Sequence, residues 1–282
     1  MTAPTIEPIT RESLEEFARF LALNLNSALS CAQWESALQA NWLPARPNFG
    51  FIMRDHGNVV GGIAAIYAAR RIAGRDESFC NLTSWCVLDT HRKYGMQLAL
   101  ALISQKGFHF TDFSPTAVVG GVLRFLKFRP IDDRQTVVAN LPHFGSVSRV
   151  VTDPDLIGAH LSGDRLQAYI DHRIFPWLNH LAVGADDNWC HVVFKRRRFK
   201  GLPSAHVLHA SDPEAFSSHL PALRNYLVTR GMATMHVDTR LLRSSPRPSR
   251  IRTGFNAKLV LSSTLEPDQV DYLYSESVAM DL

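Results

Sequence analysis

The stretch VLDTHRKYGMQLALAL, residues 87–102, decides the fold class of this chain, because its pattern changes once and sharply. Apolar, β-branched and aromatic residues over 78–88 predict a strand, and the apolar residues from about Lys93 to Ser104 predict a helix. A basic, glycine-containing turn joins the two. The first N–H groups of a helix lack intrahelical partners, and with the positive end of the helix dipole they hold anions such as a pyrophosphate. The stretch therefore predicts a phosphate-binding turn.

The composition is that of a globular protein. The 282 residues, 46% hydrophobic and 20% charged, suffice for a substantial core in one large domain or two ordinary ones. Cys31, Cys80, Cys86 and Cys190 form no Cys-x-x-Cys pair, so they predict neither a disulfide framework nor a zinc site. Residues 1–11 contain no apolar signal core, and no run approaches the roughly 20 apolar residues of a membrane span. We therefore expect a soluble, cytoplasmic protein without a metal or a membrane span.

The basic residues gather in one run. The formal net charge is +4, and the run consists of Lys195, Arg196, Arg197, Arg198 and Lys200. Such a run attracts acidic partners, here the phosphates of a cofactor, an acidic carrier protein or RNA. The alternative is a solvated strand end or loop with no partner.

The first half of the chain alternates helical and strand patterns. Its order predicts helix, helix, hairpin, strand, helix, strand, helix and strand, which is a mixed α/β layout. The expected helices cover residues 11–26, 32–41, 93–104 and the segment after Ser114-Pro115-Thr116, and the expected strands cover 49–54, 59–70, 78–88, 108–113 and 131–139.

The second half repeats that order without repeating its residues. Pro, Gly, Ser and Asp residues in Asn140–Gly163 predict a boundary between domains of residues 1–147 and 148–282. A hairpin, a helix and a strand follow in an order like that of the first half, which predicts an internal duplication. The expected elements are a helix at 164–178 broken at Pro176, strands at 189–199, 204–209, 233–239 and 258–262, a helix at 213–230 and a basic, proline-rich loop at 243–250.

The segment Arg92-Lys93-Tyr94-Gly95-Met96-Gln97 resembles the signature of the GNAT superfamily, the GCN5-related N-acetyltransferases. That signature is Gln/Arg-x-x-Gly-x-Gly/Ala, and two of its three marked positions match. The context also resembles the family: a strand ends in Asp112-Phe113-Ser114, and Lys127-Phe128 stands where the family often has Gly-Phe. The resemblance implies an α/β fold of two GNAT-like halves, each a mixed, mostly antiparallel sheet flanked by helices. Residues 1–147 would bind acyl-CoA, and residues 148–282 would shape the acceptor site.

The resemblance also implies a site for acetyl-CoA or another acyl-CoA. Gly95 lets backbone approach the pyrophosphate, Arg92 adds a charge-assisted contact, and backbone groups near residues 85–87 polarise the thioester carbonyl. Gln97 replaces the second small residue of the signature, which would crowd the phosphates. The bland alternatives are an ordinary strand-to-helix turn and helix capping by Ser114 and Thr116. The expected cofactor contacts are Val87, Arg92, Lys93, Tyr94, Gly95, Met96, Gln97, Ser114 and Thr116.

The catalytic positions depart from the family pattern. GNAT enzymes commonly place a tyrosine on the last helix of the fold as general acid, and Leu123 occupies that position here. No carboxylate lies within residues 80–88, where many members hold or orient a base. Catalytic residues therefore stay unassigned, with Ser114, Tyr272 and Tyr274 as candidates and packing as the alternative role of the tyrosines.

Three functions follow from this sequence. The leading one is an acyl-CoA-dependent N-acyltransferase that moves an acetyl or longer acyl group directly from the thioester to a small amine. The second keeps the fold but takes the group from an aminoacyl-tRNA or a carrier protein, guided by residues 195–200 and 243–252. The third is a catalytically degenerate module that binds acyl-CoA or a partner protein, as Leu123 indicates.

Overall fold

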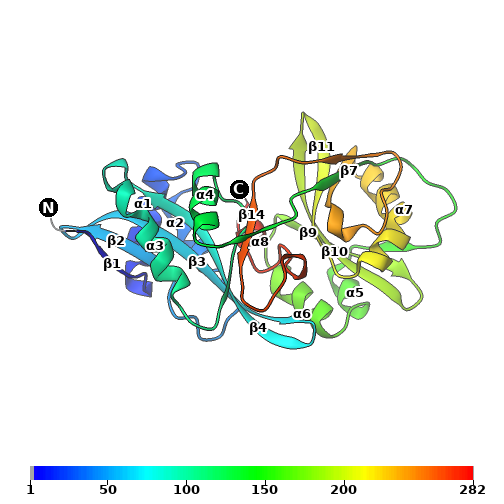
Figure 1. Ribbon diagram of the computed structural model, residues 1–282. Helices are drawn as coiled ribbons and strands as arrows, with labels where there is room; N and C mark the ends of the chain where they lie inside the picture. The colour runs from blue at the N-terminus through cyan, green and yellow to red at the C-terminus, as the bar shows by residue number, and fades with distance from the viewer. Residues whose placement is uncertain (1–2, 282) are drawn as a thin grey trace.

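The computed structural model describes residues 3–281 and contains two seven-stranded mixed sheets, which lie side by side in Figure 1. The first part of the chain forms β1 (Thr5–Pro8), α1 (Arg11–Asn24), α2 (Cys31–Leu38), β2 (Gly50–Asp55), β3 (Asn58–Ile72), β4 (Arg75–Val87), the 3₁₀ helix η1 (Asp89–Tyr94), α3 (Gly95–Ile103), β5 (His109–Asp112), α4 (Ala117–Phe125), β6 (Arg129–Ile131) and β7 (Gln135–Ala139). The remainder forms β8 (Arg149–Val151), α5 (Pro154–Ala159), α6 (Gly163–His172), β9 (Leu178–Ala185), β10 (Asn188–Phe199), β11 (Leu202–Ala210), α7 (Pro213–Thr229), β12 (Thr234–Asp238), η2 (Thr239–Leu241), β13 (Ser249–Arg252), β14 (Lys258–Leu261), η3 (Pro267–Gln269) and α8 (Glu276–Ala279).

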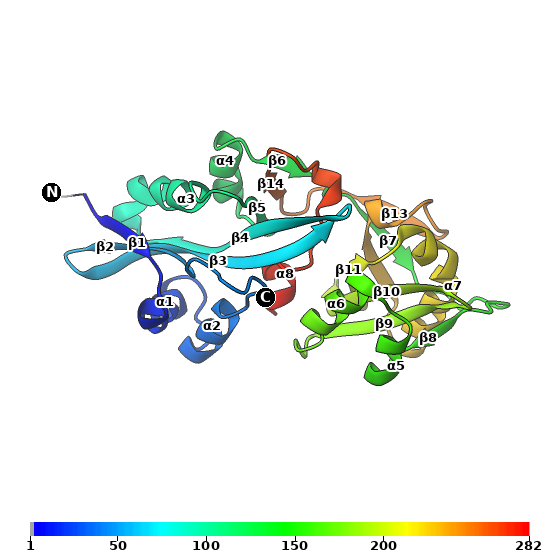
Figure 2. The ribbon, with the colours of Figure 1, turned by 90° about the horizontal axis from the view of Figure 1, so that it is seen from below.

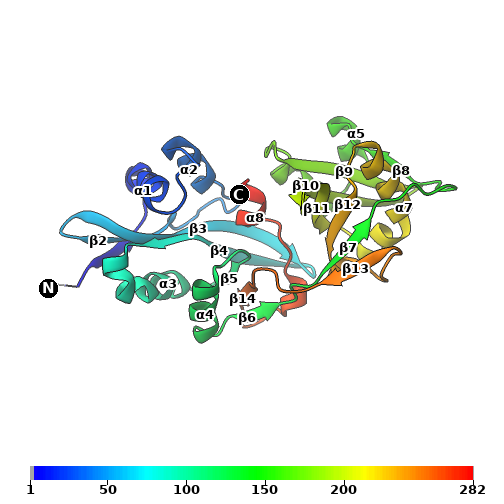
Figure 3. The ribbon, with the colours of Figure 1, turned by 90° about the horizontal axis from the view of Figure 1, so that it is seen from above.

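The first sheet has the strand order β1-β2-β3-β4-β5-β14-β6. Its neighbouring strands run antiparallel except for β4 and β5, which are parallel. Figures 2 and 3 show α1 and α2 on one face of this sheet and α3 and α4 on the other. Strand alternation explains the two layers, because Ile52 packs against the α1 side and Met53 against the α3 side.

The second sheet repeats the topology of the first. Its strand order is β13-β7-β12-β11-β10-β9-β8, with β11 and β12 as its one parallel pair among the described strands. Leu181 and Val183 of β9 join the core under α7, whereas Ala182 joins the cluster under α5 and α6. Each half therefore has a mixed, mostly antiparallel sheet covered by helices on both faces, so the predicted fold class and the two similar halves are confirmed.

In each sheet, the strand next to the parallel pair comes from the other half of the sequence. β14 lies between β5 and β6 in the first sheet, and β7 lies between β12 and β13 in the second. β7 therefore precedes the predicted boundary at 147/148 but belongs to the second sheet, and β14 follows it but belongs to the first. The division into residues 1–147 and 148–282 thus differs from the division into sheets, and the domain boundaries stay a prediction.

A shared apolar core joins the two sheets. Phe79 and Val260 of the first sheet and Val193 and Leu208 of the second are buried in one cluster. The C-terminal segment contributes to the same cluster, and its helix α8 lies on the α1 and α2 side of the first sheet, as Figure 3 shows. Helix α8 and the segment before it are therefore built into the body of the molecule.

Several local predictions need correction. The helix expected from Lys93 begins at Gly95, because residues 89–94 form the 3₁₀ helix η1. The helix expected over 164–178 ends at His172, and Leu178 begins β9 instead. Part of the loop expected at 243–250 pairs with β7 as β13.

Candidate functional site

The turn between β4 and α3 is helical from its first residue. η1 begins after Leu88, and the N–H group of Gly95 already donates to the carbonyl of Arg92. Neither η1 nor α3 has a side chain that caps its first N–H groups. The free start of the helical run therefore lies at Asp89, not at Gly95, and an anion held by this turn would meet Asp89 and Thr90 first.

Gly95 leaves an open space above the end of β4. Its φ of −53° and ψ of −41° are ordinary helical values, so no backbone strain requires a glycine here. A Cβ at this position would lie 3.6 Å from Val87 Cγ2 and 4.0 Å from Trp85 Nε1. The missing Cβ therefore keeps room between the helix start and the strand end, where both Gly95 and Val87 line a cavity.

The other side chains of the motif spread over the turn. Arg92 is exposed and pairs with Asp89 at 2.7 Å, and the ammonium of Lys93 lies over the ring of Tyr94 at 4.9 Å. Gln97 is exposed on the outer face of α3 and lines none of the cavities described below. Of the motif residues, Arg92, Gly95 and Met96 line the same cavity as Val87.

Strands β4 and β5 separate beside this turn. Their parallel pairing covers three residue pairs, from Phe79–His109 to Asn81–Thr111. Beyond Asn81, β4 continues along β3 and carries a bulge, in which Ser84 and Trp85 oppose one residue of β3 and Ser84 has a φ of +51°. A left-handed conformation is uncommon for a serine and twists the strand locally. The bulge thus helps to separate β4 from β5.

A cavity of about 830 Å³ opens along the end of β4. We call it the outer cavity, and its lining is mainly apolar, with Arg92 as its cationic side chain among the described residues. It is lined by Asn24, Leu25, Trp85, Cys86, Val87, Leu88, Asp89, Thr90, Arg92, Gly95, Met96, Thr116, Val118, Val119 and Val122. Five predicted cofactor contacts lie here: Val87, Arg92, Gly95, Met96 and Thr116.

A second cavity of about 340 Å³ continues from the first into the gap between β4 and β5. Both cavities share Leu25, Trp85, Thr116 and Val119 in their walls. We call the second one the inner cavity, because Trp34, Ile63 and Leu82, which line it, are at most 1% exposed. The polar groups in its wall belong to Asn26, Thr83, Ser84, Asp112, Ser114 and Thr116.

Two buried carboxyl groups stand beside the inner cavity. Asp112 ends β5, and Glu276 begins α8, with exposed fractions of 6% and 3%. Burial raises the pKa of Asp112 well above its ordinary value, and the neighbouring Glu276 raises it further. Burial also raises the pKa of Glu276, against the hydrogen bonds that it accepts from Ser114 and Phe113. Two such carboxyl groups cannot both ionise at low cost, so the pair retains a proton at a higher pH than free carboxyls do.

Solved structures share this architecture. A GCN5-related N-acetyltransferase from Anabaena variabilis matches with a TM-score of 0.60 at 10% sequence identity, over 91% of this chain and 72% of that one. A protein from Enterococcus faecalis described as a probable N-acyltransferase gives 0.61 at 10% identity, over 92% and 72%. A GCN5-related N-acetyltransferase from Kribbella flavida gives 0.56 at 16% identity, over 91% and 70%.

The chain has the GNAT fold. No protein-family model and no curated protein sequence matches it. At identities of 10–16% the likeness concerns the course of the backbone, so the chemistry of the site has to be argued from the residues of this chain.

The expected position of the GNAT acid lies in the core. Leu123 is fully buried under the first sheet with Leu98 and Leu102 of α3. Its side chain lines neither the outer nor the inner cavity. A tyrosine at this place on α4 would therefore point into packed apolar side chains.

The two candidate tyrosines lie away from the gap between β4 and β5. Tyr272 is buried between Phe113 and the ammonium of Lys258. Tyr274 donates its hydroxyl to Asp171 at 2.8 Å and faces Arg70. Burial raises the pKa of both hydroxyls. Neither tyrosine lines the outer or the inner cavity, whereas Ser114, the third candidate, lines the inner one.

In the second half, the corresponding turn between β11 and α7 is occupied by the side chain of Asp212. α7 follows β11 as α3 follows β4, and the Asp212 carboxylate accepts hydrogen bonds from the N–H groups of Glu214 and Ala215. Arg165 pairs with the same carboxylate at 3.1 Å. An anion would have to displace Asp212 there, so the first half of this GNAT fold is the better site for a phosphate.

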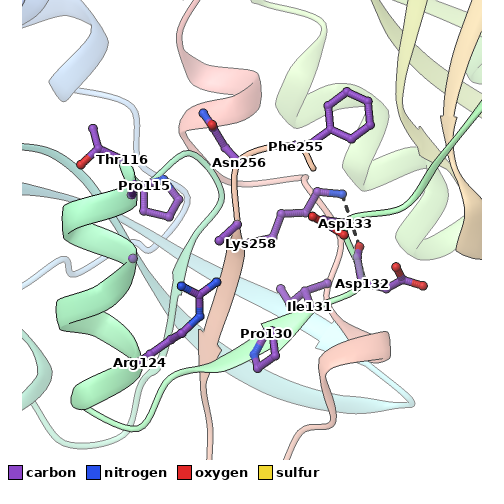
Figure 4. A pocket seen from close by; sticks show the side chains of 13 residues that line it. Pro115, Thr116, Arg124, Pro130, Ile131, Asp132, Asp133, Phe255, Asn256 and Lys258 are labelled. Carbon is purple, nitrogen blue, oxygen red and sulfur yellow. Dashed lines mark hydrogen bonds between the residues drawn. The ribbon is translucent and has the colours of Figure 1, made fainter. Parts of the chain in front are cut away.

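A further cavity of about 680 Å³ lies on the other side of α4 (Figure 4). Arg124 points into it from α4, and the Lys258 ammonium reaches the carbonyl of Asp132 at 3.5 Å across its floor. Thr116 lines this cavity as well as the outer and inner ones, while its side chain caps α4 by accepting from Val119 N–H at 3.3 Å. The predicted capping role of Thr116 is thus confirmed.

The basic run lies along β10 and its turn. Lys195 is 4% exposed and donates to the Met280 carbonyl, and Arg197 pairs with Asp281 at 2.9 Å. Arg196, Arg198 and Lys200 are exposed. Two of the five basic side chains therefore hold the C-terminal segment, which reduces the charge that the run presents to RNA or a carrier protein.

Residues 3–281 show neither a metal-ligand cluster nor a membrane-spanning helix. In that part of the chain no three His, Cys, Asp or Glu side chains converge as metal ligands do. No helix there combines the length and the apolar character that crossing a bilayer requires.

Reasoning from the sequence missed Asp112 and Glu276 as site residues. The sequence pattern indicates only the end of a strand at Asp112, and it assigns no role to Glu276. A signal existed for Glu276: it is the one acid between Leu273 and Met280, in an otherwise apolar and small-residue segment. A lone acid in such a segment is buried only with polar partners.

Proposed function

We propose that this chain is an acyl-CoA-dependent N-acyltransferase, which transfers an acetyl or longer acyl group from the thioester to a small amine. The observation that carries the proposal is that the two cavities adjoin at the gap between β4 and β5, where they have four lining residues in common. The outer cavity offers an apolar wall and Arg92 at its rim, as a pantetheine arm with phosphates at one end requires. The inner cavity offers buried apolar side chains with polar groups beside them, where a thioester and an amine can meet.

The cofactor side of the proposal rests on Val87, Arg92, Gly95, Met96 and Thr116. Their shared cavity supports direct contact with the bound acyl-CoA. Lys93 is exposed on the turn, and its charge would act on the phosphates at longer range. Tyr94 packs against the core and Gln97 is exposed, so direct contact of these two with the cofactor stays a prediction. Ser114 belongs to the inner cavity, so we assign it to the reacting end of the cofactor.

The acceptor side of the proposal includes the C-terminal segment. Glu276 accepts a hydrogen bond from Phe113 N–H at 2.8 Å, and Thr83 Oγ1 contacts the sulfur of Met280 at 4.0 Å. Residues from the end of the chain therefore hold both strands that border the inner cavity. This arrangement supports a role for the second part of the sequence in shaping the acceptor pocket.

A mass-spectrometric screen tests the proposal. Purified full-length protein is incubated with acetyl-CoA and longer acyl-CoA donors and a pooled library of primary amines. We expect an amine that gains the mass of the acyl group, together with release of free coenzyme A. Saturable binding of acyl-CoA without any product would favour the degenerate binding module instead. Absence of both binding and turnover for every donor would contradict the proposal.

Transfer from an aminoacyl-tRNA or a carrier protein is the competing function. The pairing of Lys195 and Arg197 with the C-terminal segment reduces the basic surface that the run offers to RNA or to a carrier protein. Salt-dependent retention of bulk tRNA by the protein, with no binding of acetyl-CoA, would reverse this preference.

A further inference from the structure

Ser114 and Glu276 form a hydrogen-bonded pair at the wall of the inner cavity. Ser114 Oγ donates to Glu276 Oε1 at 2.9 Å, and Ser114 itself lines the cavity. Glu276 is fixed from two further directions, because its Oε1 accepts from Phe113 N–H at 2.8 Å and its own N–H donates to Asn81 Oδ1 at 2.9 Å. The pair thus joins β4, the end of β5 and α8 at the place where the two strands separate.

Glu276 also keeps an unused acceptor. Its Oε2 is buried and has no hydrogen-bond partner among the described residues. A buried oxygen without a partner costs stability, of the order of 1–3 kcal/mol and more for a charged group. Anchoring the β5 turn through Oε1, which accepts from Phe113 N–H and Ser114 Oγ, needs neither a second carboxylate oxygen nor a charge. Glu276 therefore has a charge and a second oxygen that anchoring this turn does not require.

We propose that Ser114 and Glu276 form a proton relay for acyl transfer, in which Ser114 touches the attacking amine and Glu276 receives the proton through it. This inference rests on the proposed N-acyltransferase function. It supplies the proton acceptor that residues 80–88 lack and the proton donor that Leu123 does not provide.

The step balances in protons and bonds. A C–N bond forms between the amine nitrogen and the thioester carbonyl carbon, and the C–S bond breaks. The proton of the nitrogen moves to Ser114 Oγ while the hydroxyl proton of Ser114 moves to Glu276 Oε1. The reverse transfer then gives one proton through Ser114 to the departing sulfur, so the products are an amide and a free thiol and Glu276 is ionised again.

The charged groups around the relay make its pH dependence specific. Asp112 faces Glu276 from β5, and Lys195 of β10 acts on it from the second sheet, with Asp281 beside that lysine. The polar neighbours are Ser114 and Asn81. Glu276 raises the pKa of Asp112, so the proton that the pair retains lies on Asp112 and Glu276 ionises beside a neutral carboxyl group. Asparagine is neutral as well, so Asp112→Asn is expected to leave the pH at which the relay becomes active unchanged.

Four variants of the full-length protein test the relay. Glu276→Gln keeps the shape and the acceptor oxygen but removes the charge, Ser114→Ala removes the hydroxyl, and Ser114→Thr restores one. Asp112→Asn replaces the neighbouring neutral carboxyl group with a neutral amide. Acetyl-CoA and the amine found in the screen above serve as substrates, free thiol is followed with a chromogenic reagent, and kcat/KM is measured across pH 5 to 9, a range set around neutrality where amine acylation needs its base.

The expected results separate a relay from an anchor. Glu276→Gln and Ser114→Ala lose about 100-fold or more in kcat/KM at neutral pH, mainly in kcat, with acetyl-CoA affinity unchanged. Ser114→Thr retains most of the activity. Asp112→Asn keeps the acidic limb of the profile where the wild type has it, and Glu276→Gln loses that limb.

Other outcomes overturn the relay. Wild-type kcat/KM and an unchanged pH profile in Glu276→Gln would leave Glu276 as an anchor of the β5 turn. Equal activities of Ser114→Ala and Ser114→Thr would do the same for Ser114, and this comparison decides the matter if Glu276→Gln melts early. Failure of the wild-type protein to acylate any amine overturns the proposed function itself, which is a different result from active wild type with active variants.

Discussion

Replacing Gly95 with alanine is expected to raise the stability of the protein and to weaken its binding of acetyl-CoA. In Gly95→Ala the new Cβ meets Val87 Cγ2 at 3.6 Å and Trp85 Nε1 at 4.0 Å, both ordinary contact distances, on a helical backbone. Alanine favours a helix over glycine by about 0.5–1 kcal/mol, since it loses less backbone freedom on folding. We therefore expect the melting temperature to rise by about 1–4 °C.

The same Cβ projects into the outer cavity, where bound acyl-CoA would contact the glycine. Inserting one carbon into a closely packed contact costs about 1–3 kcal/mol. Since 1.4 kcal/mol corresponds to a factor of ten, the dissociation constant of acetyl-CoA is expected to rise about 5- to 150-fold. Differential scanning calorimetry gives the first quantity and isothermal titration the second.

Gly121→Ala is the matched control. Gly121 lies within α4, and nothing comes within 4 Å of a Cβ built there. This variant should gain similar stability and bind acetyl-CoA as the wild type does. An unchanged dissociation constant in Gly95→Ala would refute contact between the cofactor and Gly95, and a lower melting temperature would refute the open space around it.

Three further predictions follow from the structure. Arg92→Ala should leave the melting temperature unchanged, because the pair with Asp89 is exposed and such pairs contribute about 0–1 kcal/mol. The same variant should bind acetyl-CoA more weakly, and titrations at two ionic strengths should show that its binding depends less on salt. Unchanged salt dependence would exclude contact between Arg92 and the phosphates. Burial lowers the pKa of His180 to about 4, below the 6.5 of the unfolded chain, so the unfolded state binds more protons and the free energy of unfolding falls as pH drops from 6.5 towards 4. Urea unfolding at pH 7 and pH 5 should show this loss, about 1.4 kcal/mol per pH unit for each such histidine, and His180→Asn should show less of it; equal losses would contradict the assignment. Finally, a chain of residues 1–147 lacks β14, which lies between β5 and β6, so we expect no cooperative melting from it, whereas a cooperative transition would show that the first sheet closes without that strand.

Much of the first sheet is predictable because its signals are local. The hairpin of β2 and β3 follows from the His56-Gly57-Asn58 turn, and β4 and α3 follow from apolar periodicity around Gly95. The turn between β4 and α3 is predictable for the same reason, since the motif and both flanking elements are adjacent in sequence. Five of the nine expected cofactor contacts line the outer cavity.

The exchange of strands lies beyond such reasoning. β14 reads as an isolated strand, and its partners β5 and β6 are far away along the chain. A strand pattern predicts that a segment pairs but not with which neighbour. The predicted boundary at 147/148 therefore rests on composition and not on strand pairing. The proximity of Glu276 to Ser114 escapes prediction for the same reason, because only the fold brings the end of the chain to the end of β5.

The local geometry of the turn shows a different limit. Gly95 in a basic turn predicts a helix start close to it, but Asp89 already provides an acid for the first turn of a helix. The helical run therefore begins six residues earlier, as η1 over Asp89–Tyr94. A single glycine marks the space that a ligand needs, not the first residue of the helix.

Hydrogen exchange of the full-length protein with and without acetyl-CoA tests the central claim most directly, because it reports where the ligand binds. We expect slower exchange in peptides covering the end of β4, η1 and the start of α3, residues 85–96, and in those covering residues 114–122. The turn between β11 and α7, which Asp212 fills, should keep its exchange rate. Protection confined to the second half, or no protection at a saturating concentration of acetyl-CoA, would contradict an acyl-CoA site in the first half of this fold.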